Sequence, residues 1–248
     1  MSVNQASFEK AREKIIGKNR MRQGIGTLSE KTMHAVLKNY YAPDEDMHEI
    51  PIENYVADIY TGTEIIEVQT RAMNRMRKKL DAFLPLYPVT IVYPIPREKW
   101  LYWIDEETGE VSKKRKSPKK GNVYESFVEL YKIRPYLSHP NLRLRLDLID
   151  MEEYRLLNGW SHDRKKGSER YDRIPTVFAE EICIDCVRDY MQLIPFELPE
   201  QFTVKDFAKQ TKIPARLAGT ILLIFYDLKL VNRVGKSGNS YIYEVNEE

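Results

Sequence analysis

Apolar and polar residues change their spacing several times along the first 95 residues, from helical to strand-like and back. Residues 64–70 are rich in β-branched side chains, and the tight turn Thr61-Gly62-Thr63 precedes them. The predicted elements are a helix that begins at Thr27 or Ser29 and ends before Pro43, strands over 48–60 and 64–70, a basic amphipathic helix over 71–86, and an apolar strand over 89–95. Helix, hairpin, helix and strand in this order predict an α/β fold, a mixed sheet flanked by helices.

The middle of the chain predicts more strands. Residues 100–133 resemble two strands joined by a long basic arm, and residues 141–151 alternate apolar with polar side chains as a half-buried strand does. The only cysteines, Cys183 and Cys186, lie three apart in a segment with helical spacing, which predicts two buried cysteines on a helix. Two cysteines also exclude a disulfide framework, and they lack the partners for a four-ligand zinc site.

The two prolines of IPFELPEQ (residues 194–201) give the clearest signal of a domain boundary. We therefore expect a core over residues 1–195 and a second domain over residues 196–248. The core begins with a basic N-terminal arm over residues 1–26. In the second domain, Thr203 is expected to cap a first helix, and Pro214 to occupy the first position of a second helix. Two short strands around the turn GKSGN then follow. This is the order of elements in a winged helix, which binds DNA or docks on proteins.

Composition narrows the class of protein. Charged residues at 31% and hydrophobic residues at 42% describe a globular chain that can bury a core. No apolar run approaches the roughly 20 residues of a membrane-spanning helix, and the first 24 residues alternate charge with apolar side chains, unlike a secretory signal. We therefore expect a cytoplasmic protein with no membrane contact.

The formal net charge is only +2, so the distribution of charge matters more than its sum. Two basic clusters stand out: Lys113, Lys114, Arg115, Lys116, Lys119 and Lys120 form the first, and Arg164, Lys165, Lys166, Arg170 and Arg173 form the second. Basic clusters in loops suit the phosphate contacts that dominate nucleic-acid affinity. Ordinary solvated loops have the same composition, and for either cluster alone the two interpretations have equal weight.

The candidate functional residues are Asp58, Glu67 and Gln69. Residues two apart on a strand point to one face, so Glu67 and Gln69 project together, and the hairpin turn brings Asp58 beside them. Two converging carboxylates suit Mg²⁺, which takes one or two from a protein and fills its shell with water and substrate phosphate. The alternative is the solvent face of an ordinary strand. Because the apolar Ile65 shares a side with Glu67, however, this is not a clean polar face.

At this point the chain resembles the PD-(D/E)XK, or restriction-endonuclease-like, nuclease superfamily over roughly residues 27–94. Asp58, the hairpin turn and Glu67-Val68-Gln69 carry the likeness. The resemblance implies that Asp58 and Glu67 bind Mg²⁺ or Mn²⁺, that Gln69 assists catalysis in the third position, and that Glu30 is an auxiliary ligand or orients water. It also implies a homodimer, since restriction enzymes of this superfamily often work as dimers. The chain departs from the pattern twice, with Ala57 in place of proline and Gln69 in place of lysine.

The predicted helix over residues 71–86 could supply the lysine that the family pattern has at the position of Gln69. Lys78 and Lys79 are the candidates, although a basic helix surface is more often solvated or turned toward DNA. His34 and His48 are expected to be structural hydrogen-bonding residues and not catalytic bases.

The sequence thus predicts a metal-dependent DNA phosphodiesterase. Arg216 and Lys236 are expected to meet DNA phosphates in the second domain, with Lys113, Lys114, Arg115 and Lys116 as further DNA contacts. A DNA-binding regulator on a degenerate nuclease fold and a protein-interaction scaffold remain the alternatives.

Overall fold

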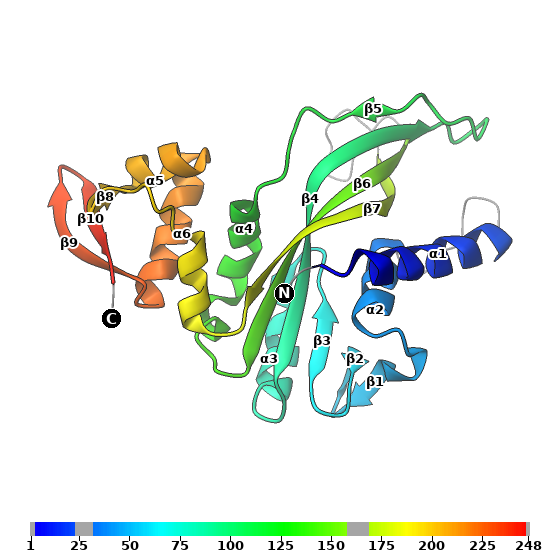
Figure 1. Cartoon of the computed structure of the whole chain (residues 1–248), viewed down its shortest axis with the longest axis horizontal. Coiled ribbons are helices and arrows are strands. Elements are labelled where there is room, and N and C mark those ends of the chain that lie inside the picture. Colours follow the sequence, from blue (N-terminus) through cyan, green and yellow to red (C-terminus); the bar gives the residue numbers. More distant parts are fainter. Residues whose placement is uncertain (1–2, 23–31, 158–168, 247–248) are drawn as a thin grey trace.

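A computed structural model of the chain describes residues 3–22, 32–157 and 169–246. Its main body is one mixed sheet with helices on both sides, and a smaller unit follows at the C-terminus (Figure 1). The strands of the main sheet are β1 (His48–Ile52), β2 (Tyr55–Tyr60), β3 (Ile65–Val68), β4 (Val89–Ile104), β5 (Arg115–Lys116), β6 (Leu142–Leu156) and β7 (Glu169–Ile184). The sequence-based expectation of a mixed sheet flanked by helices is therefore confirmed.

The strands lie in the order β1-β2-β3-β4-β6-β7, with β5 paired to β4. Strands β1, β2 and β3 form an antiparallel meander, β3, β4 and β6 are parallel, and β7 returns antiparallel to β6. The helical segment over residues 73–83 joins β3 to β4, because parallel neighbours need a crossover connection.

Two helical layers cover the sheet. On one face lie α1 (Gln5–Arg22) and α2 (Thr32–Tyr41), which pack Phe8, Val36 and Leu37 against apolar side chains of the sheet. The Tyr41 hydroxyl lies 2.7 Å from Oε1 of Glu181 and so fixes the end of α2 on β7. The other face is covered by η2 (Met73–Met76), α3 (Arg77–Phe83), η3 (Val123–Ser126), α4 (Phe127–Leu130) and η4 (Tyr131–Tyr136).

The C-terminal unit contains two helices and a small sheet. Its elements are β8 (Gln201–Thr203), α5 (Val204–Thr211), α6 (Ala215–Asp227), β9 (Val231–Ser237) and β10 (Ser240–Val245), with strand order β8-β10-β9. Thr203 caps α5 as predicted, in a capping box with Asp206, whereas Pro214 is the N-cap of α6 and not its first residue. The rings of Phe127 and Phe225 meet edge to face at 5.6 Å, so α6 shares one core with the main body.

Several sequence-based expectations were wrong at the level of single elements. Residues 48–60 form two strands and not one, because the chain reverses at Glu53-Asn54, where Glu53 has φ 54°. Strand β4 was expected to cover residues 89–95, but it continues through Pro96 to Ile104. A register shift between Pro96 and Lys99 absorbs the irregularity that proline introduces into a central strand.

The segment 123–136 is helical, although a strand was expected there. Asn122 accepts a hydrogen bond from the backbone N–H of Tyr124, and Phe127, Leu130 and Ile133 recur at helical spacing and are buried. Strand β6, expected to be half-buried, is buried on both faces along most of its length, since it lies between β4 and β7 under both helical layers.

The cysteine prediction was also wrong. Cys183 lies half-buried in β7, and Cys186 is exposed just before η5 (Val187–Leu193), so neither is a buried helix residue. The segment spans the end of the edge strand β7 and the beginning of η5, so its apolar spacing does not belong to a single helix. Both thiols are free.

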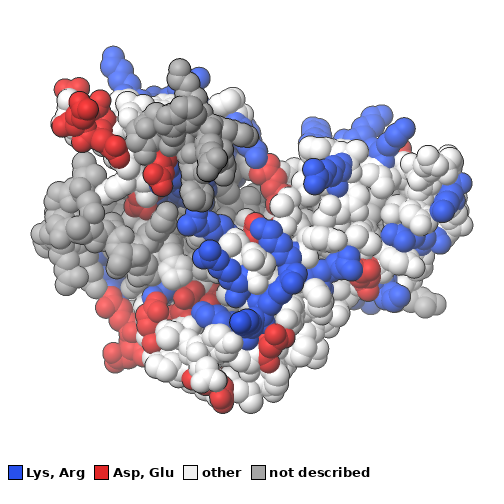
Figure 2. All heavy atoms as spheres, turned by 180° about the vertical axis from the view of Figure 1, so that it is seen from behind, with Lys and Arg blue, Asp and Glu red and all other residues white. Residues whose placement is uncertain are grey.

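The N-terminal arm is structured over most of its length as α1, and η1 (Glu45–Met47) precedes β1. In the part of the chain that the structure covers, no helix has the length and apolar composition needed to cross a bilayer. On the side opposite to Figure 1, Lys and Arg side chains gather across the middle of the molecule (Figure 2).

Candidate functional site

The hairpin of β2 and β3 brings Asp58 and Glu67 together. Gly62, at φ 92°, makes its turn possible, because residues with a Cβ rarely adopt this conformation. The backbone pairing of β2 with β3 ends at Ile59 and Ile66. By the same register, Asp58 and Glu67 would be the next two residues opposite each other. At this position, hydrogen bonds between carboxylate side chains and backbone N–H groups join the two strands instead of backbone-to-backbone bonds. The Val68 N–H donates to Asp58 Oδ2 at 2.8 Å, and the Asp58 N–H donates to Glu67 Oε1 at 3.4 Å.

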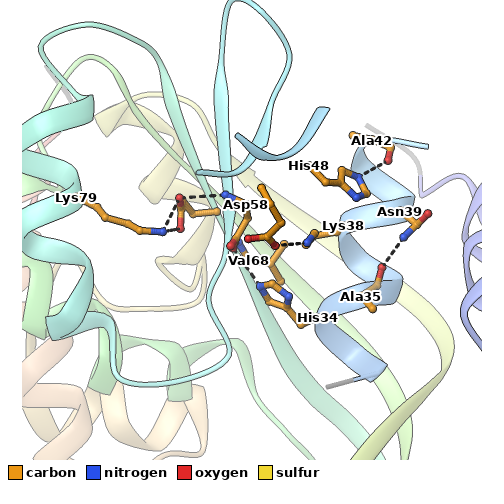
Figure 3. Close-up of polar contacts among 11 residues, drawn as sticks. His34, Ala35, Lys38, Asn39, Ala42, His48, Asp58, Val68 and Lys79 are labelled. Atoms are coloured by element: carbon orange, nitrogen blue, oxygen red, sulfur yellow. Dashed lines mark hydrogen bonds and ion pairs between the residues drawn. The ribbon is translucent and has the colours of Figure 1, made fainter. Parts of the chain in front are cut away.

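Each carboxylate has a partner from a different helix (Figure 3). From α2, His34 Nε2 lies 3.1 Å from Asp58 Oδ2. From α3, Lys79 donates to both oxygens of Glu67, at 3.0 and 2.8 Å. Leu80 and Phe83 bury the inner side of α3, which fixes the direction of Lys79 toward the end of β3. The sheet therefore supplies the two acids, and one helix from each layer supplies a basic partner.

Burial separates the pKa values of the two acids. The side chain of Glu67 is only 2% exposed, and burial followed by the charge of Asp58 raises its pKa from 4.5 to about 7, although Lys79 lowers it in part. Burial alone would also raise the pKa of Asp58, but the hydrogen bond and charge of His34, together with the Val68 N–H, lower it below its ordinary value. Two adjacent carboxyl groups with pKa values displaced in opposite directions are typical of a functional site.

The raised pKa predicts a pH-dependent stability. Folded Glu67 retains its proton at pH values where the unfolded chain has lost it, so its contribution is complete below about pH 4.5 and disappears as the pH rises to about 7. We expect the Glu67→Gln variant to become more stable relative to the parent over this interval. Urea unfolding of both proteins at about pH 5 and about pH 8 measures the change, and an unchanged difference contradicts the raised pKa.

The other predicted catalytic residues lie differently. Gln69 follows the last residue of β3, and its amide donates to the carbonyl oxygen of Arg71 instead of contacting either carboxylate. Glu30 lies outside the described residues. Lys79 occupies the place beside Glu67, so the expectation of a solvated or DNA-facing side chain at this position was wrong. His48 is a structural residue as expected, with Nε2 2.8 Å from the carbonyl oxygen of Ala42.

The basic arm is held against the sheet. Gly121 approaches Pro96 so closely that an added Cβ would lie 1.9 Å from its carbonyl oxygen, and β5 pairs with β4. The arm residues Lys114 and Lys116 pair with Glu152 and Glu98, and both also lie over the ring of Trp100. These pairs offset part of the positive charge. Lys113 and Arg115 are exposed.

In the C-terminal unit, Arg216 is exposed at the start of α6, and Lys236 is exposed on β9 over the ring of Tyr241. Nearer to Asp58 and Glu67, the segment that carries Lys79 also exposes further cations, namely Arg71, Arg75, Arg77 and Lys78. Residues 164–166 of the second basic cluster lie outside the described residues, whereas Arg170 and Arg173 lie on β7.

The acid pair has the composition of a two-carboxylate magnesium site. Among the described residues, both hydrogen bonds to the Asp58 carboxylate use Oδ2, which leaves Oδ1 for a further partner. Over residues 3–22, 32–157 and 169–246 there is no group of three or more His, Cys, Asp or Glu side chains that could enclose a metal. Mg²⁺ needs only one or two carboxylates when water and phosphate complete its shell, so Asp58 and Glu67 are the residues that would hold this ion, although Lys79 already contacts both oxygens of Glu67.

Comparison with known proteins gives a family. The chain is 27% identical over 232 residues to an uncharacterized protein of Treponema pallidum (strain Nichols), an alignment that covers 88% of this chain and 86% of the relative. No solved structure matches significantly. Residues 31–185, which contain the whole acid pair and its sheet, match the family described as "Domain of unknown function (DUF8091)". Because this match covers more than half of the chain, the protein belongs to the DUF8091 family.

Proposed function

We propose that the protein is a divalent-metal-dependent nuclease that hydrolyses phosphodiester bonds of DNA, with Asp58 and Glu67 as its metal ligands. One observation carries the proposal: the two carboxylates are joined across β2 and β3 by side-chain-to-backbone hydrogen bonds, with the Lys79 ammonium 2.8 Å from Glu67. An ordinary surface strand has no reason to bury a glutamate to 2% exposure beside a second acid.

The order of elements supports a restriction-endonuclease-like core. A helix, α2, precedes the antiparallel strands β1, β2 and β3, and a helical crossover leads to β4, parallel to β3. This is the arrangement that the resemblance implies for residues 27–94, with the acids on the second and third strands. Lys79 supplies the positive charge that this superfamily usually takes from the position of Gln69.

Each residue of the site has a distinct task in this proposal. When bound, Mg²⁺ would polarise the phosphodiester and make a water molecule more acidic. Asp58 and Glu67 would hold the ion, and His34 and the Val68 N–H keep Asp58 ionised and oriented. Lys79 lowers the pKa of Glu67, which favours its ionised form, and carries the charge that can balance a phosphate.

The C-terminal unit supports a role in DNA binding. Its helix, helix and hairpin order, with β8 completing a three-stranded sheet, is that of a winged helix. We infer that Arg216 and Lys236 meet DNA phosphates there. Protein docking is the competing role for this unit.

Incubation of the protein with supercoiled plasmid and with labelled linear duplex tests the proposal. We expect nicking or shortening of DNA in Mg²⁺ or Mn²⁺, and none in EDTA. If the protein cuts no DNA with either ion yet binds duplex with an affinity that falls as salt rises, it is a DNA-binding protein on a degenerate nuclease core. If it neither cuts nor binds DNA, both nucleic-acid roles are wrong and a protein-interaction role replaces them.

A further inference from the structure

A second charged cluster lies on the long strands β4, β6 and β7, and the proposed catalytic site does not use it. Its centre is Glu153 of β6, whose side chain is 0% exposed. Four cations converge on this carboxylate, at 3.6 Å for Lys99, 2.8 Å for Nε of Arg155, 3.4 Å for Arg170 and 3.3 Å for Arg173. The register explains the convergence, because Glu153 lies directly opposite Arg173 on β7 and Arg155 lies opposite Arg170.

The cluster carries more positive charge than Glu153 can balance. In the described part of the chain, the ion pairs of all four cations end on this one carboxylate. Nearby acids have other partners, since Asp172 accepts hydrogen bonds from Thr32 and Glu152 pairs with Lys114. The cations stabilise the Glu153 anion strongly. Although burial alone would raise its pKa, Lys99 and the arginines lower the pKa of Glu153 to about 2.

The excess of positive charge in the cluster also lowers the pKa values of two of its own cations. Burial lowers the pKa of Lys99, and the charges of the three arginines lower it further, although Glu153 raises it. Burial followed by the charge of Arg173 likewise lowers the pKa of Arg170. One or two well-placed cations suffice to pair a buried carboxylate, and each additional one adds repulsion and loses side-chain entropy. A purely structural ion pair therefore does not account for four cations.

The outer edge of the cluster is accessible. The side chain of Arg170 is 41% exposed and that of Arg155 is 30% exposed, so both present donors to solvent. Arg155 uses Nε and Nη2 on Glu153 and retains further donors, since a guanidinium carries five N–H groups. A guanidinium edge fixed by a buried carboxylate is well suited to bidentate recognition of phosphate, because its orientation is set before the ligand arrives.

We propose that Lys99, Arg155, Arg170 and Arg173, held in place by Glu153, form a phosphate-binding site that receives a phosphodiester group of the nucleic acid. The assignment of the ligand to nucleic acid rests on the proposed function. The position of the cluster agrees with it, because Arg71, just beyond the strand that carries Glu67, lies close enough to Arg170 to affect it electrostatically.

Arg170→Gln tests this site, and Arg143→Gln is the matched control. Arg143 is 39% exposed and pairs with Glu64, so it resembles Arg170 in exposure and pairing but lies outside the cluster. Both changes are made in the Asp58→Asn protein, and binding of a short fluorescein-labelled duplex is measured by anisotropy in EDTA. We expect Arg170→Gln to weaken binding about tenfold and to reduce the slope of log affinity against log salt by about one, while Arg143→Gln leaves both unchanged.

A second measurement uses inorganic phosphate and does not depend on nucleic acid. Phosphate should raise the melting temperature of the parent, and raise it more in Glu153→Gln, where the cations have lost the carboxylate with which they pair. Arg170→Gln should reduce this effect of phosphate. If Glu153→Gln does not fold, the comparison of Arg170→Gln with the parent gives the same answer.

The outcomes separate this inference from the proposed function. Because neither measurement requires metal or cleavage, a protein that cuts no DNA can still show the Arg170 effect. Equal duplex binding and equal phosphate stabilisation in the Arg170→Gln and Arg143→Gln variants overturn the site. A loss of phosphate stabilisation in Arg170→Gln without a change in duplex affinity supports the phosphate site but assigns it to a small phosphorylated ligand, which overturns the nucleic-acid assignment.

Discussion

Replacing Asp58 with asparagine should lower the rate of Mg²⁺-dependent DNA cleavage by about 10³-fold or more, equivalent to about 4 kcal/mol of transition-state stabilisation. Asparagine retains the shape of the side chain and can still accept the hydrogen bond from the Val68 N–H, so the hairpin should be preserved. It has no charge with which to bind a hard cation. The loss therefore reports the electrostatic role of Asp58 and not a defect in folding.

Plasmid nicking and isothermal titration with Mn²⁺ measure this prediction together, and we expect both cleavage and metal binding to fail. Glu64→Gln is the matched control, because Glu64 lies at the other end of the same strand region and pairs with Thr90 and Arg143, away from the acid pair. The control should cut at the parental rate. An Asp58→Asn protein that binds Mn²⁺ and cuts like the Glu64→Gln protein would show that the metal site is misassigned.

The acid pair was predictable from sequence because it depends on local geometry. A tight turn between two β-branched segments fixes the register of a hairpin, and register decides which residues face each other. Asp58 and Glu67 therefore lie as expected, one step beyond the pair of Ile59 and Ile66. Gln69 lies past the end of β3, where strand alternation no longer sets the direction of a side chain, and its amide contacts the backbone of Arg71.

Contacts between distant segments were not predictable in the same way. Lys79 is twelve residues from Glu67, and only the packing of Leu80 and Phe83 under the sheet decides that Lys79 and not Lys78 reaches the acid. The cluster around Glu153 is a stronger case. It requires the registers of three long strands, each interrupted by bulges or prolines that the sequence pattern alone does not resolve.

The length of β4 and the helical segment 123–136 show a further limit. The strand was expected over residues 89–95 only, but a register shift between Pro96 and Lys99 accommodates the prolines and lets β4 continue to Ile104. In residues 123–136, aromatic side chains favour a strand, whereas the cap at Asn122 and the buried Phe127, Leu130 and Ile133 favour helix. Tertiary packing decided between these two local signals.

The positions of Lys79 and Gln69 predict opposite effects for two substitutions. Lys79→Met should lower turnover at neutral pH by about 10²-fold, because it removes the ammonium that stabilises charge at this site. Gln69→Ala should change turnover by no more than about threefold, since its amide donates to the Arg71 carbonyl and, among the described residues, does not contact the acids. Single-turnover cleavage at saturating Mg²⁺ compares the two variants without interference from product release.

The pH dependence distinguishes a role of Lys79 on Glu67 from a general loss of structure. Lys79 lowers the pKa of Glu67, so its removal should move that pKa above about 7 and shift the rising limb of the activity profile to higher pH. Part of the lost activity of Lys79→Met should then return under alkaline conditions, whereas a misfolded variant gains nothing. Lys79→Arg retains the positive charge, so its pH profile of activity should be closer to that of the parent than the profile of Lys79→Met. If instead Gln69→Ala is the more damaged variant and Lys79→Met keeps both its rate and its pH profile, the third catalytic position belongs to Gln69, and the contact of Lys79 with Glu67 is only a structural ion pair.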